Sequence, residues 1–147
     1  MAAGLWAHQR QAAEAGAAAL AGGGRTTLIK PCGTGKTRTA GVIAARLASS
    51  GRVLAAVPTL ELAAQTIRAW HDYGDGPLGT VTIACSDQEV LSSRYIDLRG
   101  VMVTTRPDQL AAHSARPGRV TMLTTYSSLP AVAAAHSLHD LPKWDLA

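Results

Sequence analysis

The residues best suited to chemistry form a glycine-rich run at positions 31–37, which reads Pro-Cys-Gly-Thr-Gly-Lys-Thr. Its two glycines permit a tight backbone turn whose N–H groups can face a phosphate, and a helix starting there adds positive potential. Lys36 is placed to reach the β- and γ-phosphates of a nucleotide, and the Thr37 hydroxyl suits a Mg²⁺ ion. The run fits a Walker A loop, except that Lys30 stands where the general pattern has glycine.

Such a loop has to follow a strand and open a helix, and the neighbouring residues predict both. The β-branched apolar run Thr26–Ile29 favours a strand, and residues 37–49 favour a helix that Gly51 ends. Strong helix formers from Leu5 to Leu20 predict an earlier helix. The sequence therefore predicts the order helix, strand, phosphate loop, helix.

Strands and helices continue to alternate after the loop. We predict strands at 52–57, 80–85, 101–104 and 120–124, and helices at 60–73, from Ser86 to about residue 95, at 107–113 and at 130–138. Alternation at this spacing is typical of βαβ units, which build a mostly parallel sheet with helices on both faces. The expected class is α/β, of the P-loop NTPase type.

Composition limits the alternatives. The 147 residues suit one domain, and 47% apolar residues argue against disorder. A net charge of +4 permits a nucleic-acid partner, although the basic residues are scattered. Two cysteines without metal-ligand spacing, and no continuous apolar span, favour a reducing cytoplasm over export or a membrane.

The loop resembles motif I of superfamily 2 (DEAD/DEAH-box-like) helicases, which keep the G-x-G-K-T core and commonly replace the first glycine. Leu5-Trp6-Ala7-His8-Gln9 resembles the element upstream of motif I in which a glutamine reads adenine. The resemblance implies a RecA-like fold, ATP and Mg²⁺ as cofactors, Lys36 and Thr37 in catalysis, and Thr37 as a ligand of Mg²⁺. The nucleotide-binding residues that we predict are Gln9, Pro31, Cys32, Gly33, Thr34, Gly35, Lys36, Thr37 and Arg38.

Two later segments resemble helicase motifs that contact a nucleic-acid backbone. Residues 57–65 are similar to motif Ia, and residues 124–129 are similar to a T-Y-x-S-L segment. The resemblance implies a nucleic-acid partner, with DNA favoured over RNA. The residues implied in contact with it are Thr59, Gln65, Thr125 and Tyr126.

Residues 141–147 resemble the run that leads into the strand carrying D-E-A-H. We therefore expect residues 1–147 to be an incomplete part of the first RecA-like domain, ending before the Walker B carboxylates. Such a chain is expected to bind ATP and hydrolyse it very slowly, because the groups that orient water and stabilise the transition state are missing.

Two alternatives stay open at this point. One is another P-loop NTPase, such as a small-molecule kinase, which needs a substrate lid and leaves the other motif matches as coincidences. The second is a non-catalytic module or truncated remnant that binds nucleotide, nucleic acid or nothing.

Overall fold

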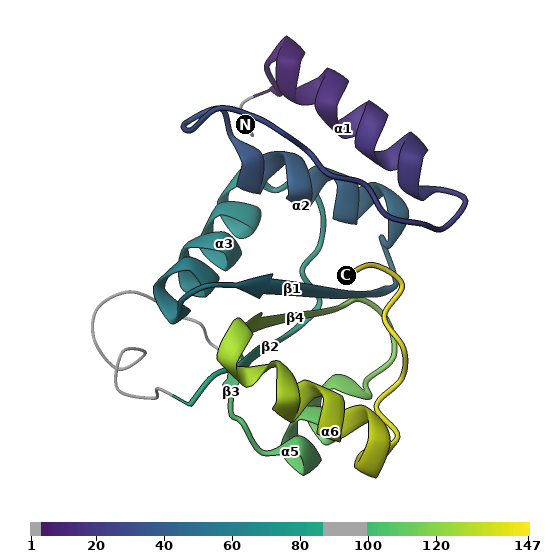
Figure 1. Ribbon diagram of the computed structural model, residues 1–147, viewed down its shortest axis with the longest axis vertical. Coiled ribbons are helices and arrows are strands. Elements are labelled where there is room, and N and C mark those ends of the chain that lie inside the picture. Colours follow the sequence, from purple (N-terminus) through teal and green to yellow (C-terminus); the bar gives the residue numbers. More distant parts are fainter. Residues whose placement is uncertain (1–3, 87–99) are drawn as a thin grey trace.

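The computed structural model describes residues 4–86 and 100–147, which form an α/β fold (Figure 1). The predicted helix beyond Ser86 therefore lies outside the described residues. The elements, in chain order, are α1 (Ala7–Leu20), α2 (Lys36–Leu47), β1 (Arg52–Val57), α3 (Leu60–Tyr73), β2 (Thr80–Ala84), β3 (Met102–Val103), α5 (Pro107–Ser114), β4 (Val120–Thr125), the short 3₁₀ helix η1 (Tyr126–Ser128) and α6 (Leu129–His139).

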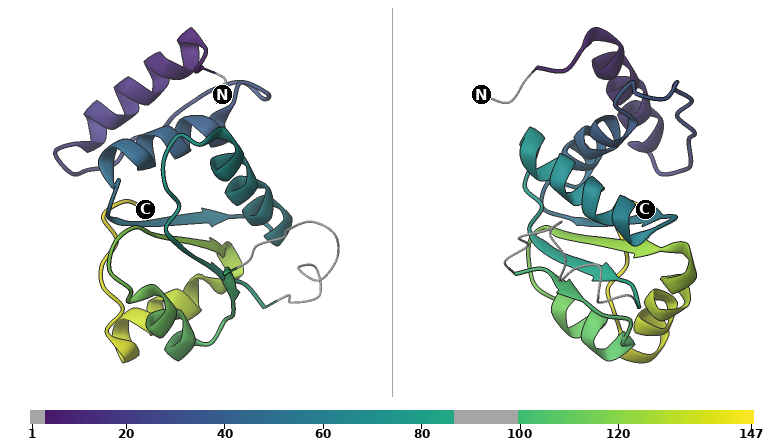
Figure 2. Two further views of the ribbon diagram at one scale, coloured as in Figure 1. Left: turned by 180° about the vertical axis from the view of Figure 1, so that it is seen from behind. Right: turned by 90° about the vertical axis from the view of Figure 1, so that its left-hand side faces the viewer.

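The strands form a parallel sheet in the order β1-β4-β2-β3. β4 lies between β1 and β2, and all six of its residues are buried. Helix α3 packs on one face of the sheet, and α5 and α6 cover the other, as the two views of Figure 2 show. The predicted fold class, a parallel sheet with helices on both faces, is confirmed.

Alternation along β4 supplies both cores. Leu123 packs with Ile67 of α3, whereas its neighbour Met122 packs with Leu110 of α5 and Val132 of α6. Successive side chains of a strand point to opposite faces, so one buried strand serves two helical layers. Parallel strands also end at one edge of the sheet, which places their carboxyl ends together.

The predicted strand at Thr26–Ile29 is wrong. No strand is assigned to these residues, which run as an extended segment beside α1 and α2, apart from the sheet (Figure 1). Leu28 packs against the cluster that joins α1 and α2, while Ile29 is 92% exposed. The outer edge of β1 instead meets Leu146, whose carbonyl accepts from the N–H of Leu54 at 2.9 Å. A strand needs a hydrogen-bonding neighbour, and β-propensity alone supplies none.

A half-buried histidine predicts acid sensitivity of the fold. The Thr82 hydroxyl lies 2.9 Å from Nδ1 of His113 and 3.1 Å from the Ser114 hydroxyl. Burial, aided by the charge of Arg116, lowers the pKa of His113 from its ordinary value of 6.5. The unfolded chain therefore binds more protons, and the free energy of unfolding decreases as pH falls from about 6.5 through the lowered pKa.

The measurement is urea unfolding at several pH values from 7.5 down to about 5. His113→Gln retains a polar side chain and removes the titration, so its unfolding free energy should change less over this range. Parallel pH profiles for the two proteins would contradict the assignment to His113.

Candidate nucleotide-binding site

The glycine-rich loop leads directly into α2, on the side of the molecule where β1 and β4 end (Figure 1). Gly33 and Gly35 have φ of 76° and 78°, values that glycine adopts without strain. Gly35 is the N-cap of α2, and Lys36 is the first helical residue. The first turn of α2 has no acidic residue, so its N–H groups and its positive end remain suited to an anion.

The ammonium of Lys36 lies against this loop. Its Nζ donates to the carbonyl oxygens of Lys30, at 3.2 Å, and of Pro31, at 3.0 Å. The Pro31 carbonyl also accepts from the Thr34 hydroxyl at 2.8 Å, which tightens the turn. Lys36 is exposed, so its ammonium can turn to a bound phosphate. The two carbonyls that it leaves can then be hydrogen-bonded by water.

Gln9 joins the first helix to the loop. Its side chain is buried, and its Nε2 lies 3.4 Å from the Thr34 carbonyl, while its Oε1 accepts from the N–H of Trp6 at 3.1 Å. A Cβ at Gly35 would lie 2.3 Å from Nε2 of Gln9, so this glycine permits the close approach. The amide therefore lies beside the phosphate loop, and its predicted contact with adenine stays a prediction.

The first turn of α2 is anchored from α3. The indole Nε1 of Trp70 donates to the carbonyl of Thr37 at 2.8 Å, while the Thr37 residue itself is exposed. The guanidinium of Arg38 is buried, with Nε 3.0 Å from an Asp75 carboxylate oxygen and its carbon 4.4 Å from the centre of the Tyr73 ring. Arg38 thus contacts the turn after α3, and its predicted contact with nucleotide stays a prediction.

Three of the four residues predicted to contact nucleic acid lie where β1 and β4 end, and the fourth, Gln65, lies within α3. Thr59 caps α3, its hydroxyl accepting from the N–H of Leu62 at 3.3 Å, and Gln65 is exposed on the same helix. Tyr126 is 57% exposed. Thr125 is buried and its hydroxyl bonds with those of Ser127 and Ser128, at 3.1 and 3.0 Å. The structure therefore brings the exposed Thr59 and Tyr126, which follow β1 and β4, to one edge of the sheet, while Thr125 is buried.

Three contacts around the loop were missed by sequence reasoning. Trp70 and Asp75 support α2 from α3 and the turn after it, and Lys30 reaches Thr39 with its ammonium at 3.0 Å. Lys30 had a signal, since a charged residue replaces glycine in the loop pattern. Trp70 and Asp75 had none, because only the packing of α2 on α3 brings them near the loop.

Comparison with known proteins gives a family match and a structural match. A family profile described as "Type III restriction enzyme, res subunit" matches residues 3–130. A solved structure of a nuclease-deletion mutant of the type ISP restriction-modification enzyme LlaGI, in complex with a DNA substrate mimic, superposes with a TM-score of 0.78 at 25% identity. The alignment covers 98% of this chain and 15% of that one. A search of curated proteins finds no match.

These matches confirm the resemblance to the first RecA-like part of a superfamily 2 helicase. The solved structure supports the fold over nearly the whole chain, and the family profile spans both the loop and the T-Y-x-S-L segment. The chain belongs to the helicase-like family of the type III restriction enzyme res subunit.

Proposed function

We propose that residues 1–147 form the ATP-binding front part of the first RecA-like domain of an ATP-dependent DNA translocase or helicase. The observation that carries the proposal is the loop at 31–37, with its two left-handed glycines, its exposed Lys36 ammonium and a helix start free of acidic residues. The alternative, a small-molecule kinase, explains the loop but does not explain why the family profile matches residues 3–130.

The residues present fit a nucleotide with Mg²⁺. Gly33 and Gly35 leave room for the loop N–H groups to approach phosphate oxygens, and Lys36 supplies a charge that attracts the terminal phosphates. The exposed hydroxyl of Thr37 is an oxygen ligand of the kind that Mg²⁺ prefers, and bound Mg²⁺ would neutralise phosphate charge. Gln9 lies close enough to the loop to read the adenine edge of the same nucleotide.

DNA is the nucleic acid that we propose as partner. The similar restriction-modification enzyme was solved with a DNA substrate mimic, and Thr59 and Tyr126 are exposed at the edge where the strands end. The N-terminus of α3 faces this edge and offers backbone N–H groups to a phosphate. Backbone contacts of this kind suit translocation, which requires no base readout.

A cytoplasmic location is part of the proposal. Cys32 is exposed and Cys85 is buried, and both are free thiols, which suits a reducing compartment. None of the helices in residues 4–86 and 100–147 combines the length and apolar character that crossing a membrane demands.

The test is titration of the purified chain with a fluorescent ATP analogue and Mg²⁺, while phosphate release is followed. We expect saturable binding that unlabelled ATP reverses and that GTP reverses less well, because Gln9 matches adenine. Phosphate release should be negligible, since the 147 residues contain no D-E-x-H sequence. Absence of any saturable binding, or equal competition by GTP, would count against the proposal.

A further inference from the structure

Lys30 directly precedes the phosphate loop, and its ammonium contacts α2. Its Nζ lies 3.0 Å from the hydroxyl of Thr39, and that hydroxyl donates to the carbonyl of Gly35 at 3.0 Å. Thr39 is fully buried, and Gly35 caps α2. The Lys30 ammonium is therefore held beside the first turn of α2, against a buried hydroxyl, whereas Lys36 is exposed.

The same residue also holds the second ammonium. The main-chain carbonyl of Lys30 accepts from Nζ of Lys36 at 3.2 Å, so two lysines and the positive end of α2 converge on one loop. In the part of the chain that the structure describes, neither lysine forms an ion pair with a carboxylate; Asp75, on the turn after α3, pairs with Arg38.

This convergence of positive charge is unfavourable unless an anion is present. Two ammonium groups repel each other, and a cation at a helix N-terminus opposes the helix dipole. A neutral side chain at position 30 would avoid both costs and could still hydrogen-bond Thr39. The charge at this position is therefore explained best by a ligand that carries several negative charges.

We propose that Lys30 is a second cation of the phosphate site, acting on bound nucleotide from beside the first turn of α2. The attraction grows with the number of phosphate charges, so Lys30 favours ATP over ADP and ADP over AMP. Lys30 is a positioning residue in this role, since its ammonium bonds Thr39 and acts on the nucleotide through the field. The inference rests on the proposed function and adds discrimination by phosphate number to it.

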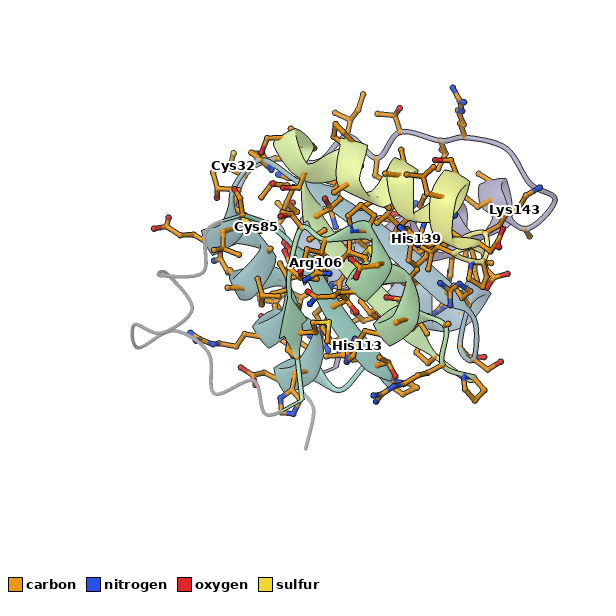
Figure 3. The ribbon with its side chains drawn as sticks, turned by 90° about the horizontal axis from the view of Figure 1, so that it is seen from below. Cys32, Cys85, Arg106, His113, His139 and Lys143 are labelled. Carbon is orange, nitrogen blue, oxygen red and sulfur yellow. The ribbon has the colours of Figure 1, made fainter. Side chains whose placement is uncertain are left out.

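The experiment compares the dissociation constants of ATP, ADP and AMP for the wild-type chain and four variants. Lys30→Met removes the charge, Lys30→Arg keeps it, and Thr39→Val removes the hydroxyl tether while leaving the charge. Lys143→Met is the matched control, because Lys143 is exposed and lies at the opposite end of the molecule from Cys32 of the loop (Figure 3).

For Lys30→Met we expect affinity to fall about tenfold for ATP and about threefold for ADP, with AMP unchanged, and the salt dependence of ATP binding to become less steep. Lys30→Arg should keep the ordering of the three nucleotides, and Lys143→Met should match wild type. If Lys30→Met does not fold, Lys30→Gln replaces it. An equal loss for the three nucleotides, or a Thr39→Val variant with the same losses as Lys30→Met, would show a structural tether only and overturn the inference.

Inorganic tripolyphosphate separates this inference from the proposed function. Binding of tripolyphosphate that weakens in Lys30→Met, without binding of any nucleotide, would support the second cation and reject an ATP site. Binding of ATP that is unchanged in Lys30→Met would support the ATP site and reject the role of Lys30. If the wild-type chain binds neither tripolyphosphate nor nucleotide, both proposals fail.

Discussion

Replacement of Lys36 by alanine is expected to lower the affinity for ATP by about a hundredfold or more, because charge-assisted hydrogen bonds to the terminal phosphates, worth about 3 kcal/mol, are lost. Among the residues that the structure describes, the Lys36 ammonium bonds the carbonyls of Lys30 and Pro31, which solvent can satisfy instead. Thermal stability should therefore change little while the affinity for ATP falls. The measurement is the fluorescent ATP titration, with the unfolding temperature recorded alongside.

Lys143→Ala is the control for this variant. It removes the same charge from an exposed lysine far from the loop, and it should bind ATP as the wild type does. If Lys36→Ala retains affinity within a few-fold of wild type, the loop does not hold phosphate in the proposed way. A large fall in unfolding temperature would instead assign the loss to folding.

The elements that the sequence predicted well are those whose signals are local. The helix at 60–73 carries its own capping threonine at Thr59 and its ending glycine at Gly74, and the structure places it at Leu60–Tyr73. The strand predicted at 52–57 lies between a glycine and a proline and is found at Arg52–Val57. Its apolar residues indicate a strand without reference to any partner strand, although only Val53 of its six residues is buried.

The segment Thr26–Ile29 shows that local signals do not determine whether a segment joins the sheet. Its β-branched residues favour an extended backbone, but the structure assigns no strand to them. Membership of a sheet depends on which edges are free nearby, and Leu146 contacts the outer edge of β1 from more than ninety residues away in the chain. Composition of the segment carries no information about that neighbour.

In the candidate site, too, the sequence predicts the local features but not the contacts that depend on packing. The loop residues are contiguous, so their types and spacing predict the turn and the helix start together. The bonds of Trp70 to Thr37 and of Asp75 to Arg38 depend on how α3 packs on α2, which the periodicity of each helix leaves undetermined. The contact of Gln9 with the loop was predictable only through the resemblance. Residues 21–30 separate the end of α1 from the loop, and nothing in their composition indicates that α1 folds back onto it.

The connection between α3 and β2 depends on one glycine, Gly79. Its φ is +67°, and a Cβ there would lie 1.9 Å from the carbonyl oxygen of Arg119 and 2.5 Å from its carbonyl carbon. That oxygen accepts from the N–H of Thr80 at 2.9 Å, at the start of the pairing between β2 and β4. The guanidinium of Arg119 is buried and donates to the carbonyls of Ala44 and Ala48 at the end of α2.

Gly79→Ala is therefore expected to destabilise the fold by roughly 3 kcal/mol or more, combining positive-φ strain of about 1 kcal/mol with a backbone clash that cannot relax in place. Moving Arg119 away would open the β2–β4 pairing and withdraw the donor that holds the end of α2. Because whole domains are stable by only about 5–15 kcal/mol, a clear fall in unfolding temperature should follow.

Gly74→Ala separates the two contributions. Gly74 has a similar φ of +59°, but a Cβ there would meet no atom within 4 Å. This variant should cost only the strain, about 1 kcal/mol, and unfold a few degrees below wild type by circular dichroism. Equal losses for Gly74→Ala and Gly79→Ala would mean that the Arg119 backbone gives way cheaply, and that the junction of α2, β2 and β4 is less tightly constrained than its hydrogen bonds indicate.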